Sequence, residues 1–120
     1  MLPLNKLIYL FGMTSLLFMM GCTTVVPHKG CYVADPYVNG VYTGECKNGI
    51  ADGKGKAVGR DIYEGGFKEG QFDGEGVYIW EGGDRYIGLF KQGHMNGNGV
   101  VIYTNGERLE GIWENGKRVK

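Results

Sequence analysis

One sequence unit of about 23 residues recurs from residue 42 to the end of the chain. The unit begins at Tyr42, Tyr63, Tyr86 and Leu109, so the intervals are 21, 23 and 23 residues. Each of these positions is followed two residues later by glycine, and four residues later by Cys46, Phe67, Phe90 and Trp113. Self-similarity at a fixed period of this length is typical of proteins that stack one small structural unit on the next.

Each unit has the features of a β-hairpin. Tyr63 and Phe67 are four residues apart, so both side chains face the same side of a strand, and the glycine between them leaves room for ring packing. Asn48-Gly49 and Asn115-Gly116 favour two-residue turns, in which both residues need a positive φ. Glu69-Gly70 and Gln92-Gly93 occupy the same place. Second strands are clearest at residues 77–80 and 100–103, which are β-branched and aromatic. The sequence predicts an all-β fold, a single-layer antiparallel β-ribbon of successive hairpins.

The pattern Tyr-x-Gly-x-aromatic-x-x-Gly-x-x-(His/Asp/Asn)-Gly-x-Gly resembles the MORN repeat. The units cover residues 42–62, 63–85 and 86–108, with a partial unit at 109–120. Cys46 replaces the aromatic residue of the first unit, whose second strand is expected to be two residues short, and Leu109 replaces the last tyrosine. Atypical terminal units are expected of caps. The resemblance implies a MORN array, and that family is associated with protein–protein contacts and with membranes.

Residues 1–21 have the features of a lipoprotein signal peptide. After Lys6, residues 7–20 are uncharged and too few to cross a hydrocarbon core of about 30 Å as a helix. Met19-Met20-Gly21-Cys22 resembles the lipobox of bacterial lipoproteins, which implies cleavage before Cys22 and acylation of that cysteine. The resemblance also implies an outer-membrane protein facing the periplasm, because Thr23 is not the aspartate associated with inner-membrane retention. Residues 22–41 form the tether and N-terminal cap. The alternative is an ordinary leader, cleaved or retained, with an incidental cysteine.

Cys31 and Cys46 are the other two cysteines. An even pair in an oxidising compartment favours a structural disulfide. Such a bond would attach the segment before the repeats to the first hairpin and, by closing a loop of 15 residues, would contribute about 3 kcal/mol. The alternative is a redox pair, although the spacing is not Cys-x-x-Cys.

Composition excludes several functions. The chain has 13 basic and 13 acidic residues, so neither nucleic-acid binding nor a polybasic membrane surface is indicated. Residues 22–120 contain no serine, which excludes a Ser-His-Asp hydrolase. His28 and His94 offer no metal-binding spacing. Gly111-x4-Gly116-Lys117 lacks the following Ser or Thr of a phosphate-binding loop. We therefore expect no catalytic residue, no metal ion and no cofactor.

The aromatic residues are the remaining candidates for function. A thin sheet cannot bury every ring, and accessible rings suit protein partners or sugar stacking. The candidate binding residues are Tyr63, Tyr78, Trp80, Tyr86, Tyr103 and Trp113. We expect a non-catalytic binding or scaffolding lipoprotein with a membrane anchor and a protein partner in the envelope. The alternatives are a glycan- or peptidoglycan-binding module, a partner strand added to the open edge after Trp113, and an enzyme of unknown type.

Overall fold

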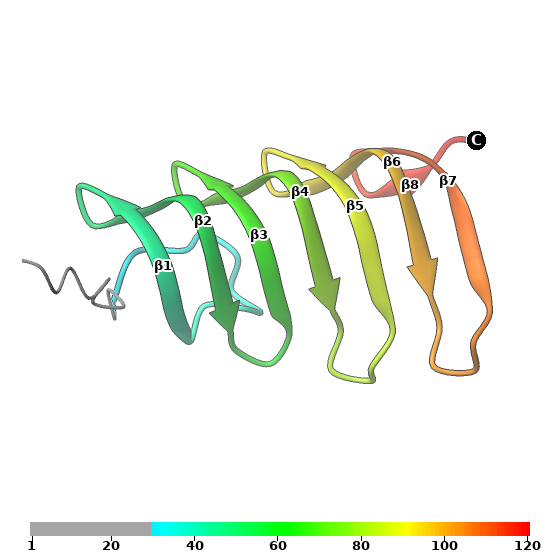
Figure 1. The fold of residues 1–120 in the computed structure, drawn as a ribbon, viewed down its shortest axis with the longest axis horizontal. Coiled ribbons are helices and arrows are strands. Elements are labelled where there is room, and N and C mark those ends of the chain that lie inside the picture. Colours follow the sequence, from blue (N-terminus) through cyan, green and yellow to red (C-terminus); the bar gives the residue numbers. More distant parts are fainter. Residues whose placement is uncertain (1–29) are drawn as a thin grey trace, which may run out of the picture.

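The computed structural model describes residues 30–120, which form one antiparallel sheet of eight strands in the order β1-β2-β3-β4-β5-β6-β7-β8 (Figure 1). The expected signal peptide and Cys22 lie outside the described residues. The strands are β1 (Val41–Lys47), β2 (Ile50–Val58), β3 (Ile62–Lys68), β4 (Gln71–Ile79), β5 (Arg85–Lys91), β6 (His94–Ile102), β7 (Arg108–Glu114) and β8 (Lys117–Arg118). The predicted all-β ribbon of successive hairpins is therefore confirmed.

Tight turns join the two strands of every hairpin. The first turn residues, Asn48, Glu69, Gln92 and Asn115, have φ between 48° and 51°, and each is followed by a glycine with positive φ. This is the backbone of a type I′ turn, whose twist matches that of the flanking strands. Glu69 and Gln92 adopt it although they are not the preferred residue types. Their positive φ is favoured because the glycine that follows and the register of the long strands fix the turn at that place.

In the first three hairpins the second strand begins directly after the turn, so it includes the Asp-Gly-x-Gly or Asn-Gly-x-Gly element. The three 9-residue strands β2, β4 and β6 have equal length. The expectation that the first unit has a shorter second strand is therefore wrong. The two missing residues lie in the connection, which spans residues 59–61 after β2 but residues 80–84 and 103–107 after β4 and β6.

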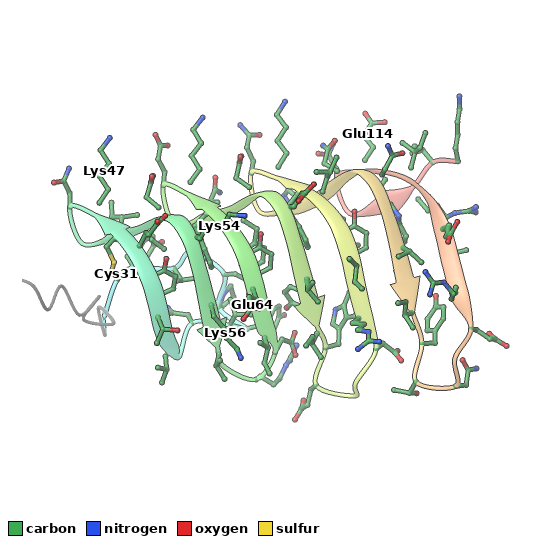
Figure 2. All side chains as sticks on the ribbon, in the orientation of Figure 1. Cys31, Lys47, Lys54, Lys56, Glu64 and Glu114 are labelled. Atoms are coloured by element: carbon green, nitrogen blue, oxygen red, sulfur yellow. A yellow bond between two sulfur atoms is a disulfide. The ribbon has the colours of Figure 1, made fainter. Side chains whose placement is uncertain are left out.

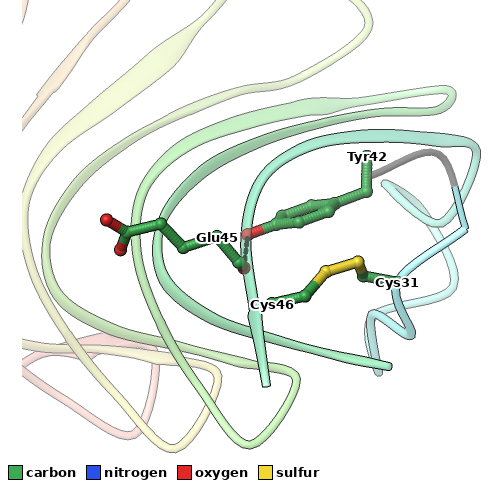
Figure 3. Close-up of a disulfide and its surroundings, with 4 residues drawn as sticks. All are labelled: Cys31, Tyr42, Glu45 and Cys46. Atoms are coloured by element: carbon green, nitrogen blue, oxygen red, sulfur yellow. Dashed lines mark hydrogen bonds between the residues drawn. A yellow bond between two sulfur atoms is a disulfide. The ribbon is translucent and has the colours of Figure 1, made fainter. Parts of the chain in front are cut away.

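Irregular pairing near facing glycines bends each of the first three hairpins. The register shifts between Gly44 and Cys46, between Gly65 and Phe67, and at the equivalent place in β5, whereas β2·β3 and β4·β5 pair without a shift. Such irregularities bend a strand and increase its twist. Figure 3 shows the result: the strands curve around Tyr42 and the disulfide, so the sheet forms a trough. We call the concave side the inner face and the other side the outer face.

The core lies on the inner face and is mostly aromatic. Tyr63 is at its centre, with its ring 5.1 Å from that of Phe67, 3.9 Å from that of Phe72 and 5.0 Å from that of Phe90. The contacts to Phe67 and Phe90 are edge-to-face, and the contact to Phe72 is stacked; aromatic pairs favour both arrangements. Tyr86 repeats the pattern with Phe90 and Trp113. Each ring therefore joins its own hairpin to the next.

Backbone hydrogen bonds also connect the hairpin turns. The amide of Gly70 donates to the carbonyl of Ala51 at 2.8 Å, and the amide of Gly93 donates to that of Phe72 at 3.0 Å. Gly116 and Met95 make the equivalent bond at 3.0 Å. These bonds run along the rim of the trough, so consecutive hairpins are joined both by strand pairing and at their turns.

Candidate functional site

The segment before β1 lies inside the trough over the first two hairpins. In Figure 1 it passes behind β1, β2 and β3. The amide of Tyr32 donates to the carbonyl of Gly49 at 2.8 Å, and the carbonyl of Tyr32 accepts from the amide of Ala51 at 3.0 Å. Further along, the amide of Ala34 donates to the carbonyl of Gly70 at 2.9 Å. We call residues 31–38 the cap segment.

The cap segment also places side chains in the core. Val33 and Val38 are completely or almost completely buried, and Cys31 is buried with them. Tyr32, which alternates with Cys31 and Val33, is exposed. The segment therefore behaves like a strand that crosses the hairpin turns, with alternate residues directed into the trough and away from it.

A disulfide between Cys31 and Cys46 attaches the cap segment to β1 (Figure 3). The Cα atoms of the two residues are 6.2 Å apart, within the range of ordinary disulfides. Cys46 occupies the place that Phe67 and Phe90 fill in later hairpins, so the disulfide replaces a ring of the aromatic core at the covered end of the trough.

The cap segment turns back after Asp35. The Asp35 Oδ1 atom accepts hydrogen bonds from the amides of Tyr37 and Val38 at 2.8 and 3.3 Å. The Tyr37 carbonyl then accepts from the amide of Asp61 at 3.0 Å, and the Arg60 guanidinium lies 4.1 Å from the centre of the Tyr37 ring. The cap therefore covers only the first part of the trough.

Asp61 is the one buried charged residue of the described chain. Its carboxylate accepts from the Tyr78 hydroxyl at 2.6 Å, from the Glu81 amide at 3.0 Å and from Arg60. Burial alone would raise the pKa of Asp61, but these hydrogen bonds outweigh burial and leave the pKa below its usual value. Burial and the hydrogen bond to Asp61 raise the pKa of the Tyr78 hydroxyl. Every partner is within the protein, so this cluster holds the loop after β2 in place.

Beyond Asp35 the trough is open and contains two hollows. The first has a volume of about 160 Å³ and is lined by Asp35, Phe72, Tyr78, Trp80, Phe90, Gly93, His94, Met95 and Gly116. The second has a volume of about 400 Å³ and is lined by Trp80, Asp84, Met95, Val101, Tyr103 and Trp113. Trp80 and Met95 line both hollows, which are therefore adjacent. We call this region the open trough.

The candidate aromatic residues divide into core and surface. Tyr78 is 8% exposed and lines the first hollow as part of its wall. Tyr63 and Tyr86 are fully buried, so the expectation that these two bind a partner is corrected. The bend of the hairpins encloses them: the hydroxyls of Tyr63 and Tyr86 donate to the carbonyls of Gly66 and Leu89 at 2.8 and 3.0 Å. Burial raises the pKa of both hydroxyls.

Trp80 and Tyr103 are partly exposed, and the structure brings them together with Trp113 in the second hollow. Trp113 is 7% exposed and its indole N–H donates to the carbonyl of Gly99 at 3.3 Å, so it is a wall of the hollow. Met95 was not predicted from the sequence, and neither was the place of His94 beside it at the start of β6. A signal for Met95 was present, because it occupies the place of Ala51 and Phe72 in the repeat.

The outer face changes character along the sheet. Figure 2 shows Lys54, Lys56 and Glu64 on it, over the first hairpins. Over the later hairpins Val77 and Val100 take the place of Lys56, and Ile87 takes that of Glu64, while Glu75 and Asn98 keep the place of Lys54 polar. Two grooves of about 630 and 620 Å³ on this face share Ile87 and Asn98. Ile87 and Leu89 are 40% and 37% exposed.

Chemically, the described residues offer a binding surface. Within residues 30–120, no three His, Cys, Asp or Glu side chains lie close enough to hold a metal ion. Nor does this part of the chain contain a helix that could span a membrane. Asp35 and His94 line the first hollow and Asp84 lines the second, and the remaining lining of both is mainly apolar.

The MORN repeat family model matches residues 39–61, 63–85, 86–108 and 110–119. These matches cover most of the chain and follow the four hairpins. Among curated proteins, none matches the chain in sequence.

Proposed function

Because this chain belongs to the MORN-repeat family, we propose that it is a non-catalytic binding module that holds a protein partner in the open trough. An all-β MORN array is typically non-catalytic and is consistent with binding or scaffolding. The observation that carries the proposal is the incomplete cover of the trough. The cap segment fills the first part, whereas Trp80, Met95 and Tyr103 remain accessible in the second.

The open trough has the composition of a protein-binding surface. Tryptophan, tyrosine and methionine are enriched in the centres of such interfaces, and aromatic side chains supply much of the binding energy when they are enclosed. Two of the larger side chains, Trp80 and Tyr103, come from the connecting loops after β4 and β6. The binding residues are thus presented by loops on a rigid sheet, as in many binding proteins.

We further propose that the module is anchored to the cell envelope. The lipobox-like Met19-Met20-Gly21-Cys22 supports an acylated Cys22, and multiple acyl chains on one residue give stable anchoring. An outer-membrane location facing the periplasm would place the Cys31–Cys46 disulfide in an oxidising compartment. The protein partner would then also be a component of the envelope.

Anchoring is tested by the intact mass of detergent-extracted protein. The expected species begins at Cys22 and carries added acyl mass, and Cys22→Ala should remain unacylated. A full-length chain without acyl mass would contradict the anchor while leaving the binding proposal unaffected.

Binding is tested by site-specific photocrosslinking in cells that express the protein. A photoreactive phenylalanine analogue at Tyr103 should give a discrete crosslinked protein, and Trp80→Ala should reduce the yield. The matched control carries the analogue at Ile87 on the outer face, which is exposed but does not line the open trough. Equal products from both positions, or a product only from Ile87, would contradict binding in the trough.

Glycan binding is the second candidate, because Trp80 and Tyr103 are partly exposed and sugar rings stack on aromatic side chains. Co-sedimentation with cell-wall sacculi that is lost in Trp80→Ala and Tyr103→Ala would favour a glycan over a protein. Sacculus binding that is unchanged in both variants would exclude recognition by these rings.

A further inference from the structure

The cap segment demonstrates how this trough holds a polypeptide. Its backbone pairs with the hairpin turns through the carbonyls of Gly49 and Gly70 and the amide of Ala51. At the same time Cys31 and Val33 enter the core while Tyr32 faces outward. The trough therefore recognises an extended chain by its main-chain groups and by alternate apolar side chains.

The third hairpin presents the same groups without an occupant. The carbonyl of Gly93 takes the place of those of Gly49 and Gly70, and it accepts no hydrogen bond within residues 30–120. Met95 pairs with Phe90 across the hairpin in the same way as Ala51 pairs with Cys46. The Met95 amide therefore corresponds to the Ala51 amide, which donates a hydrogen bond to the cap segment. The cap turns back at Asp35, before it reaches these groups.

The hollows match the side chains of such an occupant. An apolar cavity of about 150 Å³ holds a benzene ring, so the first hollow of about 160 Å³ has room for one aromatic or branched aliphatic side chain. The second, of about 400 Å³, has room for a larger side chain or for two small ones. Their shared residues, Trp80 and Met95, form a partition between two neighbouring positions.

We propose that the open trough binds an extended peptide segment of a partner protein, which continues the line of the cap segment and pairs with the turns of the third and fourth hairpins. This inference rests on the proposed function and specifies its ligand. The occupant has apolar side chains at alternating positions. One peptide N–H donates to the carbonyl of Gly93, and one peptide C=O accepts from the amide of Met95.

Charge and wall chemistry favour a peptide over a sugar polymer. Asp84 is the only charged side chain among the six residues that line the second hollow, and Trp80, Met95, Val101 and Trp113 are apolar or nearly so. A sugar buried there would leave most of its hydroxyls without partners, which is costly. An apolar side chain has no polar groups that need hydrogen-bond partners.

The test begins with a phage-displayed library of random octapeptides, panned against full-length protein in detergent micelles. Enriched sequences should place aromatic or aliphatic residues at alternating positions. A synthetic peptide of the enriched sequence should bind by fluorescence anisotropy, and Trp80→Ala and Tyr103→Ala should each weaken it at least 10-fold. Ile87→Ala, on the outer face, should change it less than 2-fold. Circular dichroism of each variant establishes that it is folded.

Backbone pairing is tested by N-methylation of the peptide, one residue at a time. Methylation of the residue whose N–H faces Gly93 should weaken binding about 5- to 10-fold, while methylation of its neighbours has little effect. If trough variants abolish binding but no N-methylated peptide is weakened, backbone pairing is wrong and binding in the trough stands. If Ile87→Ala abolishes binding instead, the trough is the wrong surface and the proposed function fails as well. If panning enriches no peptide but sacculi bind in the trough, the peptide proposal is wrong and the ligand is a glycan.

Discussion

The ring of Tyr63 lies directly over Gly76 of the neighbouring strand. A Cβ atom built at Gly76 would be 2.5 Å from the Tyr63 hydroxyl oxygen and 2.6 Å from the Cε2 atom of the ring. Gly55 and Gly99 stand in the same relation to Tyr42 and Tyr86. The second glycine of the Asp/Asn-Gly-x-Gly element is therefore required by packing, because it is the surface on which the tyrosine of each hairpin rests.

Gly76→Ala should destabilise the protein by about 1–3 kcal/mol, because the added methyl group overpacks the buried ring. In a domain of this size, the melting temperature should fall by roughly 4–8 °C for each kcal/mol of stability that is lost. Gly82→Ala is the matched control, since nothing lies within 4 Å of a Cβ at that position. Equal melting temperatures for the two variants would refute the packing role of Gly76.

Tyr86→Phe should cost about 1 kcal/mol, because it leaves the Leu89 carbonyl without the hydroxyl that donates to it at 3.0 Å. Urea unfolding followed by far-ultraviolet circular dichroism measures the change. Tyr37→Phe serves for comparison, because Tyr37 is 50% exposed and no hydrogen bond involves its hydroxyl in the described chain. A loss of stability that is no larger in Tyr86→Phe than in Tyr37→Phe would count against this role.

Asp61→Asn should lower stability at pH 7 by about 2–3 kcal/mol, because it weakens hydrogen bonds to a charged acceptor. The pKa of Asp61 is lowered in the folded protein, so its contribution is complete above the ordinary carboxyl pKa of about 3.9. That contribution is lost as pH falls through the folded pKa. The difference between wild type and variant should therefore narrow from pH 7 to pH 3.

Urea unfolding at pH 7, 5 and 3 gives the test for Asp61. Asp73→Asn is the control carboxylate, because its side chain makes no hydrogen bond or ion pair within residues 30–120. A wild-type-to-variant difference that is the same at all three pH values would show that the charge of Asp61 is not what stabilises the loop.

Removal of the disulfide should cost about 3 kcal/mol in the chain-entropy model, since Cys31 and Cys46 are separated by 15 residues. Reduction of the wild type and the double variant Cys31→Ser/Cys46→Ser should give similar losses in urea unfolding. Reductant should have no effect on the double variant. If reductant exposes two titratable thiols in the wild type but leaves its urea unfolding unchanged, the disulfide does not stabilise the protein.

The hairpins could be predicted from the sequence because their signals are local. Asn-Gly turns, paired glycines and aromatic residues four apart all act within one unit of the repeat. The turns at Glu69 and Gln92 follow from their place in that unit. The disulfide partners followed from the number of cysteines and the expected compartment, and the structure contains that pair.

The accessible surface could not be predicted, because it depends on contacts between distant segments. The residues around Tyr63 and Tyr86 in the sequence do not distinguish a buried tyrosine from an exposed one. Their burial follows from the bend at the facing glycines and from packing on the next hairpin. The exposure of Trp80 and Tyr103 depends on where the cap segment turns back, which is determined by Asp35 and by contacts with the loop at Asp61.

The hydrogen bonds between successive turns make the length of the trough a discrete variable. Gly70, Gly93 and Gly116 each join one more hairpin to the array by the same bond. Insertion or deletion of one 23-residue unit between the second and third hairpins would change the trough by one turn and leave the cap, its disulfide and the final hairpin unaltered. The number of units therefore sets the length of the trough, so gene duplication can lengthen the proposed binding site in whole steps without any change in the chemistry of a single unit.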